Sequence, residues 1–349
     1  MTATITYNNV HNFFKLNGYH LDRDDLCRIA YSFIKEGEAY EKVMGDFILD
    51  WFDARSYVLI KTSGTTGIAK KIRIDKQAMV DSAIATGDFF DLAPGNKALH
   101  CLPIDYIAGK LMLVRALILG LDMDFVEPNS HPKFNKNTVY DFAAMVPLQV
   151  QNSLNELAQV KKLIIGGAKI NKVLEKELSQ VKTEVFETYG MTETITHIAA
   201  KKIGEEAFSL LPNIEISQDE RNCLVIHAPK IAADAIITND LVTLINENQF
   251  VFLGRIDNIV NSGGIKLSPE KIEDKLSDKI HTRFFVAGIP DADLGEKLIL
   301  LIEGEKHVIS TSIFADLDKY EHPKGIFFVD KFLETENGKI KRKEILQTL

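Results

Sequence analysis

Cysteine is scarce in this 349-residue chain, which has Cys27, Cys101 and Cys223 and no others. The three are widely spaced and form no Cys-x-x-Cys pair, so their pattern predicts neither a disulfide framework nor a zinc site. A chain without such a framework is expected in a reducing compartment. We therefore predict a cytoplasmic location.

The sequence also lacks a long apolar run. The longest apolar segment, 111–121, is interrupted by Arg115 and is too short to span a bilayer. Residues 1–6 carry neither a basic region nor an apolar core, so we expect no secretory signal. These absences predict a protein that is not integral to a membrane.

Positive charge is in deficit, because 41 Lys and Arg against 49 Asp and Glu give a net charge of −8. Such a chain would be repelled by a polyanion, so nucleic acid is not an expected partner. The rest of the composition is ordinary for a globular protein, with 46% hydrophobic and 26% charged residues. The length predicts two domains.

Apolar runs of strand length alternate with longer amphipathic stretches, which predicts an α/β fold. The expected strands are 57–60, 97–102, 123–126, 162–165 and 183–187. The expected helices between them are 75–90, 107–119 and 171–181. Shorter β-like runs then follow at 224–226, 235–237, 241–245 and 250–253.

The pattern changes again near residue 257. Ser268 as N-cap and Pro269 at the first helical position predict a helix, which the strand-like runs 283–289 and 298–303 follow. We therefore predict a large N-terminal lobe, 1–256, made of mixed and parallel sheets flanked by helices. A small α+β C-terminal domain, 257–349, would complete the chain.

The segment Thr62-Ser63-Gly64-Thr65-Thr66-Gly67, with Lys70 after it, has the composition of a phosphate-binding loop. It is expected at the turn that leaves a buried strand, 57–60. Glycine lets the backbone approach a ligand, and hydroxyls and lysine can donate to an anion. The loop is not a Walker A motif, because Ala69 stands where that motif needs glycine. Taken alone, a solvated turn is the commoner explanation.

Three later segments also combine glycine with polar residues. They are 187–194 (Glu-Thr-Tyr-Gly-Met-Thr-Glu-Thr), 254–266 between the two predicted domains, and 336–342 (Glu-Asn-Gly-Lys-Ile-Lys-Arg). Each is a weak signal by itself, since an Asn-Gly turn is most often only a hairpin tip.

In this order the segments closely resemble the adenylate-forming superfamily of acyl- and aryl-CoA ligases, adenylation domains and luciferases. The family's Tyr-Gly-x-Thr-Glu motif matches 189–193 without a departure. Its Thr-Gly-Asp motif matches 238–240 with Asn239 in place of glycine, and its phosphate loop has Ala69 and Lys71 in place of proline and glycine. The resemblance runs from about residue 56 to the end of the chain.

The resemblance implies a two-step reaction that uses ATP, Mg²⁺ and coenzyme A. A carboxylate attacks the α-phosphate of ATP to give an acyl-adenylate, and a thiol then displaces AMP. The implied nucleotide-binding residues are Thr62, Ser63, Gly64, Thr65, Thr66, Gly67 and Lys70 at the phosphates, Gly166, Gly167, Ala168, Tyr189 and Gly190 around adenine, and Asp240 and Arg255 at the ribose.

Three residues are implied in the chemistry itself. The attack brings two negative groups together, so the site must supply positive charge and positioned donors. By the resemblance, Lys339 bridges the carboxylate and the α-phosphate, Thr192 touches the α-phosphate, and Glu193 binds Mg²⁺.

Asp257 is the hinge that the resemblance implies. Rotation there would exchange the loop that carries Lys339 for a second face of the C-terminal domain. That face bears Ser262, Gly263 and Gly264, which would line the approach of the thiol of coenzyme A.

The chain is most similar to compact members of the family, the bacterial o-succinylbenzoate–CoA ligases of menaquinone biosynthesis. Because the phosphate loop begins near residue 62, the N-terminal lobe is expected to be shortened, and a homodimer would cover the surface left open. The second carboxylate of that acid needs a cation or several donors. The candidates for this acyl pocket are Tyr106, Lys110, Arg115 and His197, although Arg115 and Lys110 also fit purely structural roles.

Two alternatives stay open. The first keeps the ligase chemistry but activates another short-chain, aryl or amino acid, with a carrier protein as an alternative thiol. The second is a non-catalytic, nucleotide-binding regulatory protein, at which the departures at Ala69, Lys71 and Asn239 would hint. Such a protein would have no need of Lys339.

Overall fold

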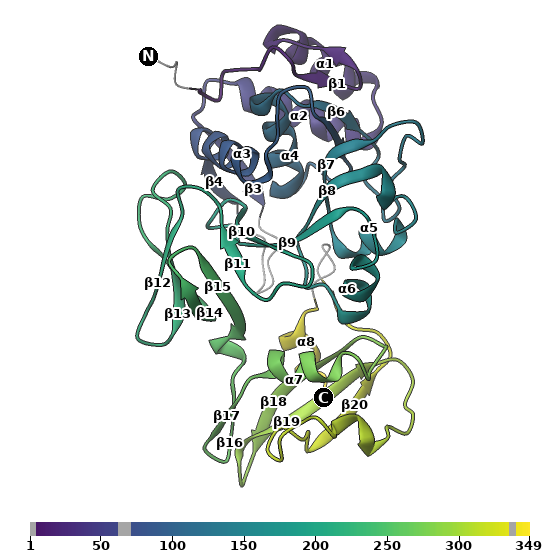
Figure 1. Ribbon diagram of the computed structural model, residues 1–349, viewed down its shortest axis with the longest axis vertical. Helices are drawn as coiled ribbons and strands as arrows, with labels where there is room; N and C mark the ends of the chain where they lie inside the picture. The colour runs from purple at the N-terminus through teal and green to yellow at the C-terminus, as the bar shows by residue number, and fades with distance from the viewer. Residues whose placement is uncertain (1–4, 62–70, 335–339) are drawn as a thin grey trace. The chain divides into compact units, whose positions relative to one another are not determined.

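The computed structural model describes residues 5–61, 71–334 and 340–349 (Figure 1). The chain forms two compact units. Unit 1 comprises Met1–Lys169, Leu178–Glu215 and His227–Ile236, and unit 2 comprises Ile170–Glu177, Ile216–Ile226 and Ile237–Leu349. Unit 2 thus includes segments that precede residue 257, and the predicted domain boundary at 256/257 stays a prediction.

Unit 1 contains a mixed sheet whose strands lie in the order β11-β10-β9-β8-β7-β5-β6-β1-β2. The central neighbours from β6 to β9 run parallel, and β10 and β11 continue the sheet antiparallel. The strands are β1 (Lys15–Leu16), β2 (Tyr19–His20), β5 (Lys97–His100), β6 (Asp122–Phe125), β7 (Tyr140–Met145), β8 (Val160–Ile165), β9 (Glu184–Gly190), β10 (His197–Lys202) and β11 (Phe208–Leu210). The predicted lobe of mixed and parallel strands is confirmed.

Helices accompany this sheet in unit 1, and four of them share an apolar core with it. They are α1 (Arg23–Glu36), α2 (Ala39–Phe52), α3 (Lys76–Phe90), α4 (Ile107–Leu119), α5 (Pro147–Asn152) and the short η1 (Leu157–Gln159), while α6 (Lys172–Leu178) contains residues of both units. Side chains of α1 to α4, β5, β6 and β7 belong to the same buried cluster. Helix α4 is buried on every side from Leu111 to Ile118, as expected of a helix in the centre of a lobe.

The predicted strand 57–60 forms a separate hairpin in unit 1. β3 (Tyr57–Lys61) pairs antiparallel with β4 (Lys71–Asp75), and segment 62–70 connects the two. Val58 and Ile60 are buried, but Leu59 between them is 41% exposed. The strand expected to be buried is thus buried on one face, and the other face of the two-stranded hairpin is toward solvent.

Unit 2 contains two groups of strands. β12 (Glu215–Gln218), β13 (Cys223–His227), β14 (Ile236–Asn246) and β15 (Gln249–Arg255) lie in that order. The second group has the order β17-β16-β19-β18, with β20 paired to β19. Its strands are β16 (Val260–Ser262), β17 (Ile265–Leu267), β18 (Phe284–Asp291), β19 (Gly295–Glu303) and β20 (Gly325–Val329), and the helices of the unit are η2 (Ile256–Asn258), α7 (Pro269–Leu276), η3 (Thr311–Phe314) and α8 (Arg342–Leu346).

The second sheet of unit 2 is covered by helices on both faces. Alternate residues of β18 and β19 point to opposite sides, so one row packs with α7 and the other with α8. Ile272 of α7 and Ile345 of α8 are almost fully buried in these two clusters. This arrangement confirms the predicted small α+β fold of the C-terminal part.

Helix α7 begins at Pro269 and Ser268 is its N-cap residue, both as predicted from the sequence, but Ser268 does not cap the helix with its side chain. Its hydroxyl makes no hydrogen bond to the helix N–H groups. Instead Ser268 Oγ donates to the carbonyl oxygen of Leu253 at 3.3 Å, which joins the start of α7 to β15.

None of the helices in the described ranges combines the length and the apolarity that a bilayer crossing demands.

Candidate active site

Several predicted site residues lie outside the described residues. They are Thr62, Ser63, Gly64, Thr65, Thr66, Gly67 and Lys70 of the phosphate loop, and Lys339. Their roles stay predictions.

The predicted adenine wall, 166–168, follows β8 and packs closely against β9. Gly166 donates its N–H to the carbonyl oxygen of Met145 at 3.3 Å, and a Cβ at Gly166 would lie 2.8 Å from Thr188 Oγ1. Thr188 in turn donates its hydroxyl to the carbonyl of Ile165 at 2.9 Å. Glycine at 166 therefore has a packing reason in addition to the predicted contact with adenine.

The motif residues Tyr189 and Gly190 belong to β9 itself. We expected the motif to begin after the strand, but the strand continues because β9 pairs with β10 as far as the Gly190–His197 pair. The ring of Tyr189 packs against Phe208, with centroids 5.9 Å apart. A Cβ at Gly190 would lie 2.3 Å from the carbonyl oxygen of Thr196, so a larger residue does not fit there.

The turn that carries Thr192 and Glu193 is held by the next threonine and is strained. Thr194 Oγ1 accepts a hydrogen bond from the N–H of Met191 at 2.9 Å and lies 2.7 Å from the carbonyl oxygen of Thr196. Ile195 has a φ of +65°, an uncommon value for a β-branched residue. Backbone strain of this kind concentrates at functional sites, so the turn is a candidate for function on structural grounds alone.

Glu193 is exposed on this turn and Thr192 is half-buried. Within the described ranges, no three His, Cys, Asp or Glu side chains gather in a way that could hold a metal ion. A single carboxylate fits Mg²⁺ only where a substrate brings further oxygen ligands, which is common for magnesium bound with nucleotide phosphates.

Arg115 is the most unusual of the predicted acyl-pocket residues. It is 2% exposed, and its Nη2 lies 3.4 Å from Thr196 Oγ1 and 3.4 Å from His197 Nδ1. No carboxylate pairs with it among the described residues, and its Nε has no hydrogen-bond partner there. Burial lowers the pKa of Arg115 to about 10, so the guanidinium stays charged at neutral pH.

His197 is the neutral neighbour of Arg115. Burial, followed by the nearby charge of Arg115, holds the pKa of His197 well below its usual value of 6.5. Since Arg115 can only donate, Nδ1 must accept and the ring proton lies on Nε2, which faces Thr86 Oγ1 at 3.4 Å. The hydroxyl of Thr86 in turn donates a hydrogen bond to the carbonyl oxygen of Ser82 at 2.9 Å.

Two further buried polar residues, His100 near Arg115 and Ser82 in the helix α3, were not predicted from the sequence. His100 is fully buried at the end of β5, and burial with the charge of Arg115 lowers its pKa to about 3. His100 Nε2 and Ser82 Oγ have no hydrogen-bond partner among the described residues, although buried polar atoms almost always have one. The available signal was a histidine that stands among the apolar residues 98–102 of the expected strand 97–102.

We name the set of Ser82, Thr86, His100, Arg115, Thr196 and His197 the Arg115 cluster. It joins α3, β5, α4 and the first residue of β10 within unit 1.

Lys110, by contrast, is fully engaged. Its Nζ donates to the carbonyl oxygen of Ile104 and lies 4.8 Å from the ring centre of Phe47. Tyr106 is the N-cap residue of α4 and makes no side-chain capping bond. Of these two candidates, Lys110 has contacts that a structural role explains.

In unit 2, the predicted ribose and hinge residues lie together. Asp240 of β14 stands opposite Arg255 of β15, and Arg255 Nε is 3.6 Å from Asp240 Oδ1. Arg255 Nη2 also donates to Asp257 Oδ2 at 2.9 Å. Asp240, Arg255 and Asp257 thus form one charged group.

The predicted thiol-facing residues form a hairpin turn. Ser262 ends β16 and pairs with Ile265 of β17, and Gly263 and Gly264 between them have φ values of +60° and +84°. A two-residue turn with two positive φ angles strongly favours glycine. The turn therefore accounts for the glycine pair, and the predicted contact with coenzyme A stays a prediction.

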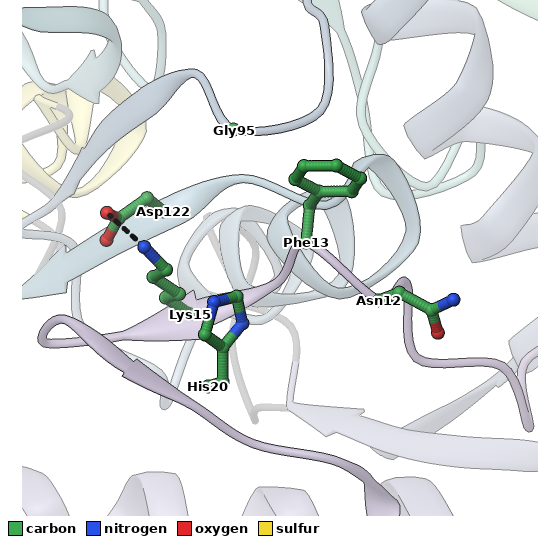
Figure 2. A pocket seen from close by; sticks show the side chains of 6 residues that line it. All are labelled: Asn12, Phe13, Lys15, His20, Gly95 and Asp122. Carbon is green, nitrogen blue, oxygen red and sulfur yellow. Dashed lines mark ion pairs between the residues drawn. The ribbon is translucent and has the colours of Figure 1, made fainter.

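A separate hollow of about 230 Å³ lies in unit 1, away from the residues predicted for the site (Figure 2). Its lining comprises Asn12, Phe13, Lys15, His20, Gly95 and Asp122. Lys15 and Asp122 form an ion pair of 3.9 Å there.

Residues 32–218 match the family model of AMP-binding enzymes. The chain is 24% identical to the 2-succinylbenzoate–CoA ligase of Lactococcus lactis over 85% of its own length and 72% of that protein. It is 32% identical to a solved acyl-CoA synthetase (AMP-forming)/AMP-acid ligase II-like protein of Dyadobacter fermentans, with a TM-score of 0.63, over 92% of this chain and 97% of that one.

A third relative supports the fold alone. The o-succinylbenzoate coenzyme A synthetase of Bacillus subtilis, solved with ATP and magnesium ion, is 19% identical, with a TM-score of 0.72 over 92% of this chain and 82% of that one. The ordered motifs, the mixed sheet and the family match agree. This chain belongs to the AMP-binding enzyme family, the adenylate-forming superfamily that its motifs resemble.

Proposed function

We propose that this protein is an ATP-dependent carboxylic acid–CoA ligase whose acid carries a second carboxylate, as o-succinylbenzoate does. The family and the names of its relatives support the ligase chemistry. The observation that carries the choice of acid is the charged, buried Arg115 that has no carboxylate partner among the described residues. The product would be o-succinylbenzoyl-CoA, made in the cytoplasm for menaquinone biosynthesis.

A buried cation without a counter-charge is costly, because the guanidinium has left water and its partners in the described ranges are neutral. Its neighbours are Thr196 and the neutral His197. A ligand carboxylate at Arg115 would supply the missing charge and accept from the free Nε of Arg115. A monoacid would leave the guanidinium unpaired, which is how a site rejects a substrate that lacks one polar group.

The contact of Arg115 with Thr196 also suits binding of a second carboxylate. Its Nη2 reaches Thr196, four residues after Thr192, which we propose contacts the α-phosphate. One carboxylate of the acid would react there while the other lies at Arg115. Holding the acid at both ends limits the orientations from which it attacks phosphorus, which favours in-line displacement.

In the first step the reacting carboxylate attacks the α-phosphorus, and pyrophosphate leaves. Mg²⁺, when bound, neutralises phosphate charge. We propose that Glu193 holds the ion, that Thr62–Lys70 hold the β- and γ-phosphates, and that Lys339 stabilises the charge that develops between acid and α-phosphate.

In the second step the thiol of coenzyme A attacks the acyl carbon and AMP leaves. We propose that rotation at Asp257 withdraws Lys339 and presents Ser262, Gly263 and Gly264 to the thiol. Asp240 and Arg255 would hold the ribose in both steps, since Asp240 is an acceptor for its hydroxyl groups.

The decisive experiment measures pyrophosphate release from ATP with o-succinylbenzoate, with benzoate and with a panel of short-chain, aryl and amino acids, each with and without coenzyme A. We expect release with o-succinylbenzoate and thioester only when coenzyme A is present. Release with monoacids alone would reject the dicarboxylate and keep the ligase. No release with any acid would reject the ligase.

The role of Arg115 is tested by Arg115→Leu. Losing a charge-paired contact in a buried site typically costs ~2–5 kcal/mol, so we expect KM for o-succinylbenzoate to rise about 10²-fold while KM for benzoate changes little. Lys110→Met is the matched control, because Lys110 is a half-buried cation of the same helix that already has partners. Equal rises in KM for both acids would remove Arg115 from the acyl pocket.

A further inference from the structure

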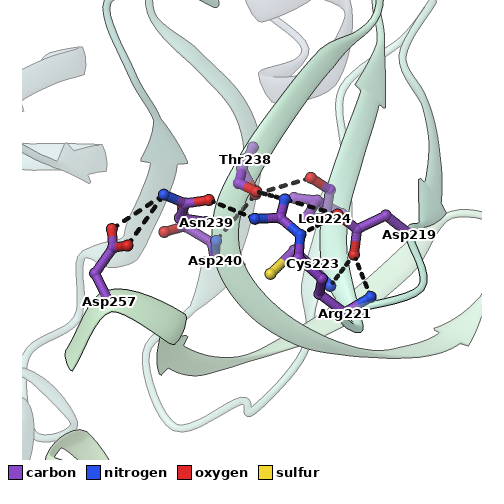
Figure 3. A network of polar contacts seen from close by, with 8 residues as sticks. All are labelled: Asp219, Arg221, Cys223, Leu224, Thr238, Asn239, Asp240 and Asp257. Carbon is purple, nitrogen blue, oxygen red and sulfur yellow. Dashed lines mark hydrogen bonds and ion pairs between the residues drawn. The ribbon is translucent and has the colours of Figure 1, made fainter. Parts of the chain in front are cut away.

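The predicted hinge residue Asp257 is held by a side chain that the family's usual glycine cannot supply (Figure 3). Asn239 Nδ2 lies 3.2 Å and 3.1 Å from the two carboxylate oxygens of Asp257 and donates to them. Asn239 is the residue that replaces glycine in the Thr-Gly-Asp motif. The contact is therefore particular to this chain's departure from the motif.

The orientation of Asn239 is fixed from its other side. Arg221 Nη1 donates to Asn239 Oδ1 at 3.0 Å, and Arg221 Nη2 donates to the carbonyl of Thr238 at 3.0 Å. Because arginine can only donate, the oxygen of the Asn239 amide must face Arg221 and its NH₂ group must face Asp257.

Arg221 is itself held in place. Its Nε donates to Asp219 Oδ2 at 2.8 Å, and the other carboxylate oxygen of Asp219 accepts from the N–H groups of Arg221 and Cys223, each at 2.9 Å. These hydrogen bonds form a continuous series from the turn before β13 through β14 to the start of η2, as Figure 3 shows. Every member belongs to unit 2.

We propose that Asn239 is a latch for the hinge, a positioning residue that ties β14 to Asp257 and favours the conformation in which Asp257 faces β14. This inference rests on the proposed function, which assigns the pivot to Asp257. A rotation that moves the Asp257 carboxylate must break both hydrogen bonds from Asn239 and the ion pair with Arg255. Asn239 therefore sets part of the equilibrium between the adenylate-forming and thioester-forming conformations.

The expected size of the effect is moderate. The side chains of Arg255 and Asp257 are 51% and 43% exposed, so their ion pair contributes little. Hydrogen bonds from a preoriented amide to a carboxylate contribute more, and losing them should shift the equilibrium roughly two- to tenfold.

The latch residue Asn239 is also adjacent to the residue that we propose binds the ribose. Asn239 directly precedes Asp240, and Arg255 reaches both Asp240, at 3.6 Å, and Asp257, at 2.9 Å. The proposed ribose ligand and the latch are consecutive residues of one strand. The hinge is thereby connected to the strand that would bind nucleotide.

The latch can be tested by hydrogen–deuterium exchange of the full-length protein without substrates. The reporter is the amide of Ile259, which donates to the carbonyl of Ile256 at 3.2 Å across η2. The variants are Asn239→Gly, Asn239→Asp, and Asn239→Asp combined with Asp257→Asn. The control is Asn246→Gly, which removes an asparagine of the same strand whose amide binds Gln249 instead, at 3.0 Å.

We expect exchange at residues 256–259 to be roughly two- to tenfold faster in Asn239→Gly and faster still in Asn239→Asp, where two carboxylates repel. The double variant should return toward the wild-type rate, because its donor and acceptor are exchanged. Asn246→Gly should leave these amides unchanged. Wild-type exchange in both single variants, or no recovery in the double variant, would overturn the latch.

A second measurement connects the latch to catalysis. We expect Asn239→Gly to change the ratio of pyrophosphate exchange to thioester formation from preformed adenylate at least about twofold, in line with the same shift. An unchanged ratio together with unchanged amide exchange would remove the latch alone. Absence of both half-reactions in the wild type would instead reject the proposed function, while the exchange of residues 256–259 would still report on the Asn239 contact.

Discussion

Arg115 of α4 and Arg342 at the start of α8 both lie in packed surroundings, yet they have different partners. Arg342 donates to both carboxylate oxygens of Glu273, at 2.8 and 2.9 Å, and lies 5.2 Å from the ring centre of Phe285. Arg115 is more deeply buried, and the partners within its hydrogen-bonding reach among the described residues are Thr196 and the neutral His197.

The contacts of Arg342 explain why the fold contains this cation, whereas the contacts of Arg115 do not explain its burial. The two-pronged contact of Arg342 with Glu273 joins α8 to α7, and Glu273 also accepts from the N–H of Val286 at 2.8 Å. In the part of the chain that the structure describes, Arg115 contacts no carboxylate, so the free-energy cost of burying its charge must be offset elsewhere. Binding of an anionic substrate is the explanation that we propose.

The largest expected effect is the change in the rate of adenylate formation that Lys339→Ala causes. This substitution should remove the cation that we propose at the reacting groups and leave the contact of Arg342 with Glu273 in place. We expect adenylate formation to fall by about 10³-fold, because a group that stabilises transition-state charge is lost. Thioester formation from preformed adenylate, measured in the same preparation, should stay near the wild-type rate. Equal losses in both half-reactions would show that Lys339 has another role.

The next effect concerns stability and has opposite signs for the two arginines. Arg342→Leu leaves the buried Glu273 unpaired and should lower the free energy of unfolding by about 3–5 kcal/mol. Arg115→Leu removes an unpaired charge and should leave that free energy unchanged or raise it slightly. Urea titrations followed by circular dichroism report both variants, and the fluorescence of Trp51, the single tryptophan, reports unit 1. A comparable destabilisation by Arg115→Leu would mean that Arg115 has a structural partner.

The smallest effect is a dependence of stability on pH. Burial and Arg115 depress the pKa values of His100, to about 3, and of His197. Below pH 6.5 the unfolded chain binds protons that the folded protein refuses, so stability is lost as the pH falls, by at most about 1.4 kcal/mol per pH unit for each histidine. The urea midpoint of Trp51 fluorescence should therefore decrease from pH 6.5 to pH 5.5.

The arginine variants sharpen this measurement. Arg115→Leu removes the second cause of both depressed pKa values, so the loss of stability on acidification should level off at a higher pH than in the wild type, while Arg342→Leu should leave the pH dependence in unit 1 as it is. A midpoint that does not change between pH 6.5 and pH 5.5 would contradict the neutral state of the two histidines.

Local patterns predicted the elements of the fold well. The expected helices 75–90 and 107–119 are found as α3 and α4 with nearly the same bounds. Both have a strong local basis, such as the side chain of Asp75 that accepts from the N–H of Ala78. Ser268 is the N-cap residue as predicted, but the partner of its hydroxyl was not predictable, because that partner lies in β15 rather than in its own helix.

The candidate site was predictable where it consists of an ordered motif. Tyr189, Thr192 and Glu193 were predicted from the sequence because the motif is contiguous, and their roles stay predictions. His100 was not predicted, because nothing near it in the chain indicates that Arg115 lies close by. The glycine pair 263–264 was predicted for the thiol, whereas its positive φ angles show a turn that needs glycine in any case.

The sequence by itself determined the family, the α/β class and the likeness to acid-activating enzymes, since these depend on motifs and periodicities that neighbouring residues carry. Only the tertiary structure decided which charged side chains have partners. Arg115 meets His197 across 82 positions of the chain, and Asn239 meets Asp257 across 18. Whether a buried charge is paired depends on which strands and helices pack together, and a local pattern does not contain that information.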